Sequence, residues 1–398
     1  MFKKRGVPKR YAGFFRNRVA IATATLMGTI IGAGILGIPY VVAKTGFLYG
    51  FIIIGLIGLA SMALNLFLGE VVLRTKGHHQ LTGYAGKYLG PWGKRITALA
   101  MFLGIYGALT AYLIGEGAAL FTISGLGSPL FFSILFFLVG SFIVYRGIKT
   151  TGRAELILIS LLFLMVILIG IFSFNQINLD NLAAHDITKL FVPYGVVLFA
   201  FIGFASIPEI REELSSETKK MRKALLIGSI IPILLYIVFA AIVIGMVGLD
   251  NFELLQPNER IATIALSIYS QPLLGLFANL LAVLAMFTSF LALGMALLDI
   301  YEYDYKLSKN MAMILTFSVP LVIVMFNLTS FISVLEITGI FSGGLNGIAI
   351  VLMNWKAKKA GERKPEFSVK WVKLVGVLLI VMFVLGMLYG LWELLGKI

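Results

Sequence analysis

The sequence predicts an all-α polytopic membrane protein, built as a five-plus-five inverted repeat with one additional helix. The chain is 59% hydrophobic and only 13% charged, and its mean hydropathy is +0.97. A helix that spans a membrane needs about 20 mostly apolar residues. Eleven segments meet this need, near 19–43, 47–73, 96–122, 129–146, 154–174, 190–210, 224–248, 270–299, 311–327, 330–354 and 372–392.

The positive charges predict how these segments cross the membrane. If the eleven segments cross the membrane in turn, 29 of the 33 lysines and arginines lie on the same side of it as the N-terminus. The other four are Lys44, Lys189, Arg260 and Lys397. Lysine and arginine gather in the cytoplasmic segments of membrane proteins, so we expect the N-terminus inside the cell and the C-terminus outside. The expected units are a basic cytoplasmic tail, a first repeat, a second repeat and a peripheral helix, at residues 1–18, 19–174, 189–355 and 371–392.

Composition excludes several classes of function. The net charge of +14 follows the topology, so it does not indicate a nucleic-acid partner. The chain has no cysteine and three histidines, which argues against thiol chemistry, a metal centre and an intramembrane enzyme. It has no nucleotide-binding loop, so the energy for any active process would come from a sodium or proton gradient, and we expect no cofactor. We expect a monomer or weak oligomer in the lipid bilayer of the inner (plasma) membrane.

The first apolar segment is built to break midway. Residues 25–40 read T-L-M-G-T-I-I-G-A-G-I-L-G-I-P-Y. This stretch contains Gly28, Gly32, Gly34 and Gly37, and then Pro39. Glycine and proline are the poorest helix formers. Non-helical backbone at membrane depth survives where protein buries it or where it lines a watery cavity. The alternative is an unbroken helix that uses its glycines for close packing.

A second copy of this pattern favours the broken helix. Residues 203–208 and residues 34–39 both read G-x-x-x-I-P, and each stretch lies in the first helix of a five-helix half. The charge bias makes the first and the sixth helices run in opposite directions. Two broken helices at matching places of inverted halves are typical of secondary transporters, whose half-helix ends bind the substrate.

Two further sites carry chemistry within predicted spans. Glu116 follows Tyr112 by one turn in the third span, and a charged side chain at a span centre costs ~2.5–3.5 kcal/mol on insertion scales. It could carry a proton, although a structural role or a place in the outer vestibule is the favoured interpretation. In the eighth span, Ala285, Thr288 and Ser289 could offer oxygens to a hard cation. Hydroxyls bonded to carbonyls of their own helix are the simpler interpretation.

Several stretches together resemble the amino acid–polyamine–organocation superfamily. They are G-T-I-I-G-A-G-I-L-G-I-P-Y, A-F-I-G-F-A-S-I-P-E, E-V-V-L-R and A-Y-L-I-G-E-G. Within it, the sequence is most similar to the hydroxy and aromatic amino acid permeases and related permeases, over residues 19–392. The resemblance implies an amino acid transporter that works by alternating access.

The resemblance also implies roles for particular residues. The substrate carboxylate would bind N–H groups of Gly32, Ala33 and Gly34. The ammonium group would bind carbonyls of Ile30 or Ile31 and of Phe199 or Ile202. An aromatic wall would come from Phe199, Phe201 and Phe204, with Tyr112 opposite. A sodium ion would bind Gly28, Ile31, Ala285, Thr288 and Ser289. This fit favours sodium. Some proton-driven relatives place a lysine of the fifth span where the sodium would lie, and the absence of an interior lysine there weakens that proton mechanism but leaves one through Glu116 open.

Rival functions differ in the residues they require. A channel would need pore-lining rings. A carrier of polyamines or cationic amino acids would need acids beside the breaks, and the nearest, Glu209, lies past Pro208 toward the cytoplasm. The predicted pocket is therefore neutral and apolar. We expect a hydrophobic or aromatic amino acid as the substrate, moved by symport or exchange.

Overall fold

The computed structural model describes residues 17–147 and 152–396, and every regular element in these two ranges is a helix. The basic tail predicted at 1–18 lies outside them except for its last two residues. The first half comprises α1 (Arg18–Ile30), α2 (Gly34–Thr45), α3 (Phe47–Arg74), α4 (Leu81–Ser124), α5 (Pro129–Tyr145), α6 (Gly152–Ser173), η2 (Phe174–Gln176), α7 (Asp180–Ala183) and η3 (Ile187–Lys189). The second half begins with α8 (Tyr194–Ala200), η4 (Phe204–Ser206), α9 (Ile207–Glu213), η5 (Thr218–Lys220), α10 (Met221–Val247), α11 (Leu249–Leu254) and α12 (Ala262–Tyr269). It continues through α13 (Pro272–Asp299), η6 (Ile300–Asp304), α14 (Lys309–Met325), α15 (Phe331–Thr338), η7 (Gly339–Gly343), α16 (Gly344–Ala360) and α17 (Val372–Gly396).

Helices occupy the predicted apolar segments within the described residues, but two of these helices are short. Eight helices within the described residues are long and apolar enough to cross a bilayer, and the bent pair α1–α2 makes a ninth. The apolar helices α5 and α14 have 17 residues each. A helix of that length covers about 25 Å, less than the roughly 30 Å hydrocarbon core. Eleven spans therefore stay a prediction, while the all-helical membrane architecture is confirmed.

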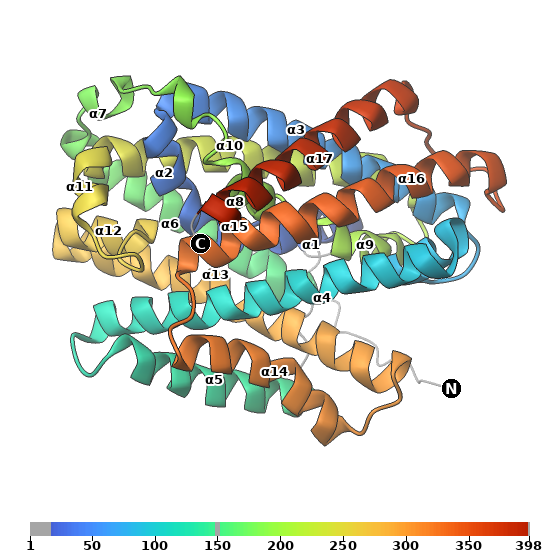
Figure 1. Ribbon diagram of the computed structural model, residues 1–398, viewed down its shortest axis with the longest axis horizontal. Helices are drawn as coiled ribbons and strands as arrows, with labels where there is room; N and C mark the ends of the chain where they lie inside the picture. Colours follow the sequence, from blue (N-terminus) through green and yellow to red (C-terminus); the bar gives the residue numbers. More distant parts are fainter. Residues whose placement is uncertain (1–16, 148–151, 397–398) are drawn as a thin grey trace.

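The broken first span forms the centre of the bundle. Every residue of α2 except Lys44 is buried. Figure 1 shows α1 and α2 inside the bundle, α5 and α14 together along one side, and α17 lying across the outside next to α16. The helices α3 and α10 pack along each other, and α4 packs against α5, α13 and α16. The last helix, α17, buries one face, which packs on α16, η7 and α8.

A buried carboxylate fastens the connection between α16 and α17 to the bundle. Glu70, at the end of α3, is fully buried and accepts hydrogen bonds from Arg74 (2.9 Å) and from the backbone N–H of Val369 (3.0 Å). The ammonium of Lys358 lies 3.2 Å away. Two cations beside one carboxylate offset the cost of burying it. This end of the bundle is therefore held rigidly around residues 361–371.

Candidate functional site

The first span breaks where the glycines predict. The helix α1 ends at Ile30, α2 begins at Gly34, and the two axes are bent by 54°. At the break, the N–H of Gly32 donates to the carbonyl of Ile30 (3.1 Å) rather than continuing the helical ladder to Gly28. The carbonyl of Gly28 consequently loses its helical donor. The N–H groups that open α2 point out of its N-terminus, where a helix attracts anions.

Gly34 permits the closest approach in the site. A Cβ atom on Gly34 would lie 2.5 Å from the Cβ of Ala200 and closer still to its Cα. Real Cβ atoms do not come this near, so only glycine allows α2 to begin directly against the end of α8. The second role of Gly34, beyond exposing its N–H, is therefore to bring the two broken spans together.

The second span breaks at the matching place. The helix α8 ends at Ala200, residues 201–203 leave the helix, and the short 3-10 turn η4 leads into α9. The hydroxyl of Ser206 donates to the carbonyl of Gly203 (2.9 Å), which satisfies a backbone group exposed by the break. Both breaks expected from the sequence are thus confirmed.

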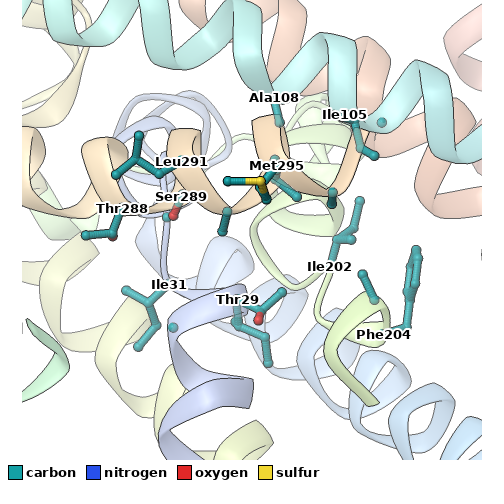
Figure 2. A pocket seen from close by; sticks show the side chains of 18 of the residues that line it. Thr29, Ile31, Ile105, Ala108, Ile202, Phe204, Thr288, Ser289, Leu291 and Met295 are labelled. Carbon is teal, nitrogen blue, oxygen red and sulfur yellow. The ribbon is translucent and has the colours of Figure 1, made fainter. Parts of the chain in front are cut away.

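A cavity of about 680 Å³ lies where the two breaks meet. Pockets of roughly 300–1,000 Å³ are typical of small-molecule sites. In Figure 2, Thr288 and Ser289 of α13 face Thr29 and Ile31 across the cavity, and Ile202 and Phe204 form one side of it. It also extends to Gln80 and Glu212, whose exposed side chains mark its mouth.

The opposite end of the bundle is closed above the breaks. A Cβ atom on Gly37 would meet Leu335 and Val196 at 2.9 Å, so the helices are in tight contact there. Beyond that contact lies a separate pocket of about 190 Å³, bordered by Lys44 and Arg260. The main cavity therefore opens toward the end that carries Gln80 and is sealed toward the end that carries Lys44.

Most of the predicted substrate residues line the cavity, and two do not. The lining set comprises Ile30, Ile31, Gly32, Gly34, Tyr112, Phe199, Ile202 and Phe204. Ala33 is buried behind the break, and the ring of Phe201 turns away to pack on Tyr236, with ring centroids 4.9 Å apart. The expectation that Phe201 belongs to the aromatic wall is therefore wrong. The N–H of Gly32 is also not free, because it already donates to Ile30.

The five residues predicted to hold a cation all border the cavity, namely Gly28, Ile31, Ala285, Thr288 and Ser289. The hydroxyls of Thr288 and Ser289 donate to the carbonyl of Ala285, at 3.3 and 3.0 Å, as the simpler interpretation required. A hydroxyl that donates in this way keeps its oxygen lone pairs available. The bonds within the helix are therefore confirmed, and the cation site stays a prediction. No cluster of histidine and acidic side chains suited to a metal ion occurs among the described residues.

Glu116 is not in a vestibule. Its side chain is fully buried, it does not line the cavity, and neither carboxylate oxygen has a hydrogen-bond partner within residues 17–147 and 152–396. Tyr112, one turn earlier on α4, does line the cavity. Of the interpretations drawn from the sequence, the buried group fits this structure and the outer vestibule does not, while a role as proton carrier stays a prediction. Glu116 is a buried acid one turn away from the cavity wall.

Sequence reasoning missed part of the wall. Leu158 and Leu162 of α6, and Leu291 and Met295 of α13, complete its apolar surface. The apolar stretch of α6 carries only Ser160 as a polar residue, so the sequence did not show which face of that helix looks inward. On α13, Leu291 and Met295 follow Thr288 by three and seven residues, so the predicted hydroxyls could have marked this face. Tyr236 of α10 was also missed, although a tyrosine hydroxyl inside a span always requires a partner.

The chain is similar to known membrane transporters along most of its length. It is 29% identical to "Tyrosine-specific transport system 1" of Haemophilus influenzae, over 94% of this chain and 95% of that protein. It is 26% identical to "Glutamine transporter 2" of Aliivibrio fischeri, over 79% and 83%. A crystal structure of MhsT in complex with L-phenylalanine shares the fold, with a TM-score of 0.64 and 18% identity over 94% of this chain and 98% of that one.

These relatives are transport proteins rather than enzymes, and the apolar helices agree with a multi-pass membrane protein. The sequence model of the tryptophan/tyrosine permease family matches residues 16–392. The chain therefore belongs to the tryptophan/tyrosine permease family.

Proposed function

We propose that the protein carries a neutral amino acid, preferably an aromatic one, across the membrane by sodium-coupled alternating access. The observation that carries this proposal is the cavity between the two breaks. One side offers the N-terminus of α2 and the carbonyl of Gly28 that the break frees, and the other offers the apolar side chains of Phe199, Ile202 and Phe204. A zwitterion with an apolar side chain matches both sides.

The substrate would lie with its carboxylate at the start of α2. The N–H groups of Ala33 and Gly34 open that helix, and its partial positive charge favours an anion there. The side chain would point toward Phe204 and Met295. The relatives named for tyrosine and glutamine, and the MhsT complex with L-phenylalanine, support a neutral amino acid.

A cationic substrate fits less well. Glu209 and Glu212 do border the cavity, but they belong to α9 and lie toward its mouth. The wall beside the breaks carries Ile105, Ala108 and Leu291 instead. Acids at the mouth can draw a cation in, whereas the binding position itself offers no carboxylate among the lining residues of the breaks.

Sodium would bind between α1 and α13. The carbonyls of Gly28 and Ile31 and the hydroxyls of Thr288 and Ser289 border one part of the cavity, and oxygen ligands suit a hard cation. One charge that crosses with the field supplies ~2.3 kcal/mol per 100 mV. A proton is the second candidate ion, because Glu116 is a buried acid without a hydrogen-bond partner in the described chain.

The open cavity would face the cytoplasm. The charge bias of the sequence puts the N-terminus inside the cell, and Arg18 lies at the same end of the bundle as the cavity mouth, bonded to Ser216 (2.6 Å). The structure would then be the inward-facing member of the transport cycle, in a monomer or weak oligomer.

Uptake into proteoliposomes tests the proposal. Labelled tyrosine, tryptophan, phenylalanine and glutamine are offered under a sodium gradient and, separately, under a proton gradient. We expect sodium-driven uptake of the aromatic amino acids. Ser289→Ala should then abolish the sodium response, while Ser160→Ala, which removes a hydroxyl bonded to its own helix on α6, should keep it.

The other outcomes decide among the alternatives. Uptake driven only by protons and lost in Glu116→Gln would replace sodium with a proton. Full sodium dependence in Ser289→Ala would refute the α13 site. No uptake of any amino acid under either gradient would overturn the proposed function.

A further inference from the structure

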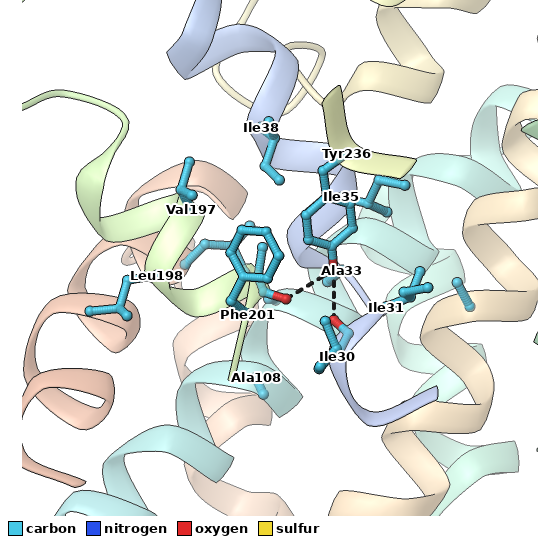
Figure 3. Packing of buried hydrophobic residues seen from close by; sticks show 14 of the residues in the cluster. Ile30, Ile31, Ala33, Ile35, Ile38, Ala108, Val197, Leu198, Phe201 and Tyr236 are labelled. Carbon is cyan, nitrogen blue, oxygen red and sulfur yellow. Dashed lines mark hydrogen bonds between the residues drawn. The ribbon is translucent and has the colours of Figure 1, made fainter. Parts of the chain in front are cut away.

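One buried hydroxyl contacts both breaks at once. The hydroxyl of Tyr236, on α10, lies 2.8 Å from the carbonyl oxygen of Ile30 and 2.9 Å from that of Ala200. Figure 3 shows the two hydrogen bonds converging on the tyrosine from the two broken spans. The side chain of Tyr236 is fully buried.

Each of these carbonyls belongs to the last residue of a helix. Ile30 ends α1 and Ala200 ends α8, so each carbonyl group lies where the helical ladder stops. Unpartnered backbone groups are costly in an apolar interior. A hydroxyl has one proton, which the two carbonyls must share. The carbonyl of Ile30 also accepts from the N–H of Gly32, so the shared hydroxyl is an additional link between the two helix ends, and it lasts only while both carbonyls stay within its reach.

The two helices come from opposite ends of the bundle. The helix α1 approaches the site from the cavity mouth, where Arg18 bonds Ser216, and α8 approaches from the sealed end, where Val192 borders the smaller pocket. A change that opened the sealed end and closed the mouth would shift these two helix ends relative to each other. Both hydrogen bonds to Tyr236 form in the arrangement seen here, and such a shift would lengthen at least one of them.

We propose that Tyr236 is a positioning residue that holds the two broken spans in the cavity-open conformation. Its hydroxyl links the helix end that borders the open side to the helix end that borders the closed side. Its ring is held in place by Phe201, which explains why that aromatic residue turns away from the cavity. The inference rests on the proposed function only in that it assumes alternation between two conformations.

Cysteine accessibility tests the proposal without any transport measurement. The chain has no cysteine, so single substitutions report alone. Ala296→Cys places a thiol in the open cavity, and Ser333→Cys places one at the smaller pocket of the sealed end. Both are labelled with a polar maleimide in nanodiscs, where the reagent reaches both faces. Ser333 is partly exposed in this conformation, so position 333 has a basal labelling rate, and an increase above that rate reports the population of a conformation in which the sealed end is open.

Tyr236→Phe should shift this balance, because it removes the hydroxyl and keeps the ring. The loss of one shared hydrogen bond predicts a roughly threefold to tenfold faster labelling at position 333. Labelling at position 296 should fall or stay unchanged. The matched control is Tyr194→Phe, which removes a buried hydroxyl bonded to the Met382 carbonyl (3.4 Å), away from both breaks, and should change neither rate.

Three results would overturn the proposal: unchanged labelling at position 333, equal acceleration at both positions, or the same shift in the control. If Tyr236→Phe does not fold, Phe201→Leu supplies the second test. It leaves the hydroxyl and loosens the ring, so a smaller shift in the same direction is expected. Failure of amino acid uptake would not affect these readouts, so the proposed function and this inference can fail separately.

Discussion

The two breaks offer different surfaces to the cavity. The first break presents mainly backbone, because Gly28, Gly32 and Gly34 all border the cavity. The second presents side chains, those of Phe199, Ile202 and Phe204. The single glycine of the second break, at 203, serves packing instead, since a Cβ there would lie 2.5 Å from Ile30.

This difference suggests that the two spans recognise different parts of an amino acid. The backbone of one amino acid is the same as that of another, and the first break offers fixed backbone groups that can recognise it. The side chain varies, and the second break offers replaceable side chains. We therefore infer that substitutions at the first break affect all substrates alike, whereas substitutions at the second change preference among them.

Gly34→Val should have the largest effect, because it disrupts the close contact between Gly34 and Ala200 that joins the two broken spans. The new side chain would collide with the backbone of Ala200 and force the two spans apart. Overpacking of this kind costs roughly 3 kcal/mol. We expect a lower melting temperature in thermal unfolding and no uptake of any substrate.

Gly55→Val is the matched control for this collision. A Cβ on Gly55, in α3, meets nothing within 4 Å, so the same exchange should be tolerated there. A Gly34→Val protein with normal stability and normal substrate affinity would show that the two spans do not need their close approach.

The sequence predicted the breaks better than the faces around them. Glycine and proline locate a break directly, because they act on the backbone of their own segment. Phe199 lies near the end of α8, Phe201 in the break and Phe204 in η4, so the three side chains do not follow one helical periodicity. The sequence therefore could not show which of them face the cavity. The choice between burial and a vestibule position for Glu116 stayed open for a related reason, because the sequence does not show which neighbouring helix covers that side of α4.

The link through Tyr236 was beyond sequence reasoning altogether. Residues 30, 200 and 236 are far apart along the chain, and two of them contribute only a backbone carbonyl. Backbone groups carry no signature of residue type. Such a contact becomes visible only when the packing of the α1, α8 and α10 helices is known.

Phe204→Ala should change substrate preference rather than abolish transport. It removes an aromatic surface from the cavity wall, and differences in apolar contact discriminate among substrates by about tenfold. Competition assays with tyrosine, phenylalanine and glutamine should show a loss for the two aromatic substrates and little change for glutamine.

Phe201→Ala provides the contrast, because its ring packs on Tyr236 and does not reach the cavity. Its relative affinities for the three substrates should match those of the unmodified protein, even where its stability is lower. Equal changes of preference in both variants would mean that the second break does not select the side chain.

Gly32→Ala should have the smallest effect and the most uniform one. A Cβ on Gly32 would lie 3.3 Å from the hydroxyl oxygens of both Tyr112 and Ser289, so these groups must give way by a few tenths of an ångström. We expect a roughly threefold weaker affinity, a fraction of a kcal/mol, measured by binding of the same three substrates. The decisive result is an equal loss of affinity for all three substrates, because every amino acid has the same α-carboxylate and ammonium groups. A loss confined to the aromatic substrates would instead place their side chains against the first break and reverse the assignment of the two spans.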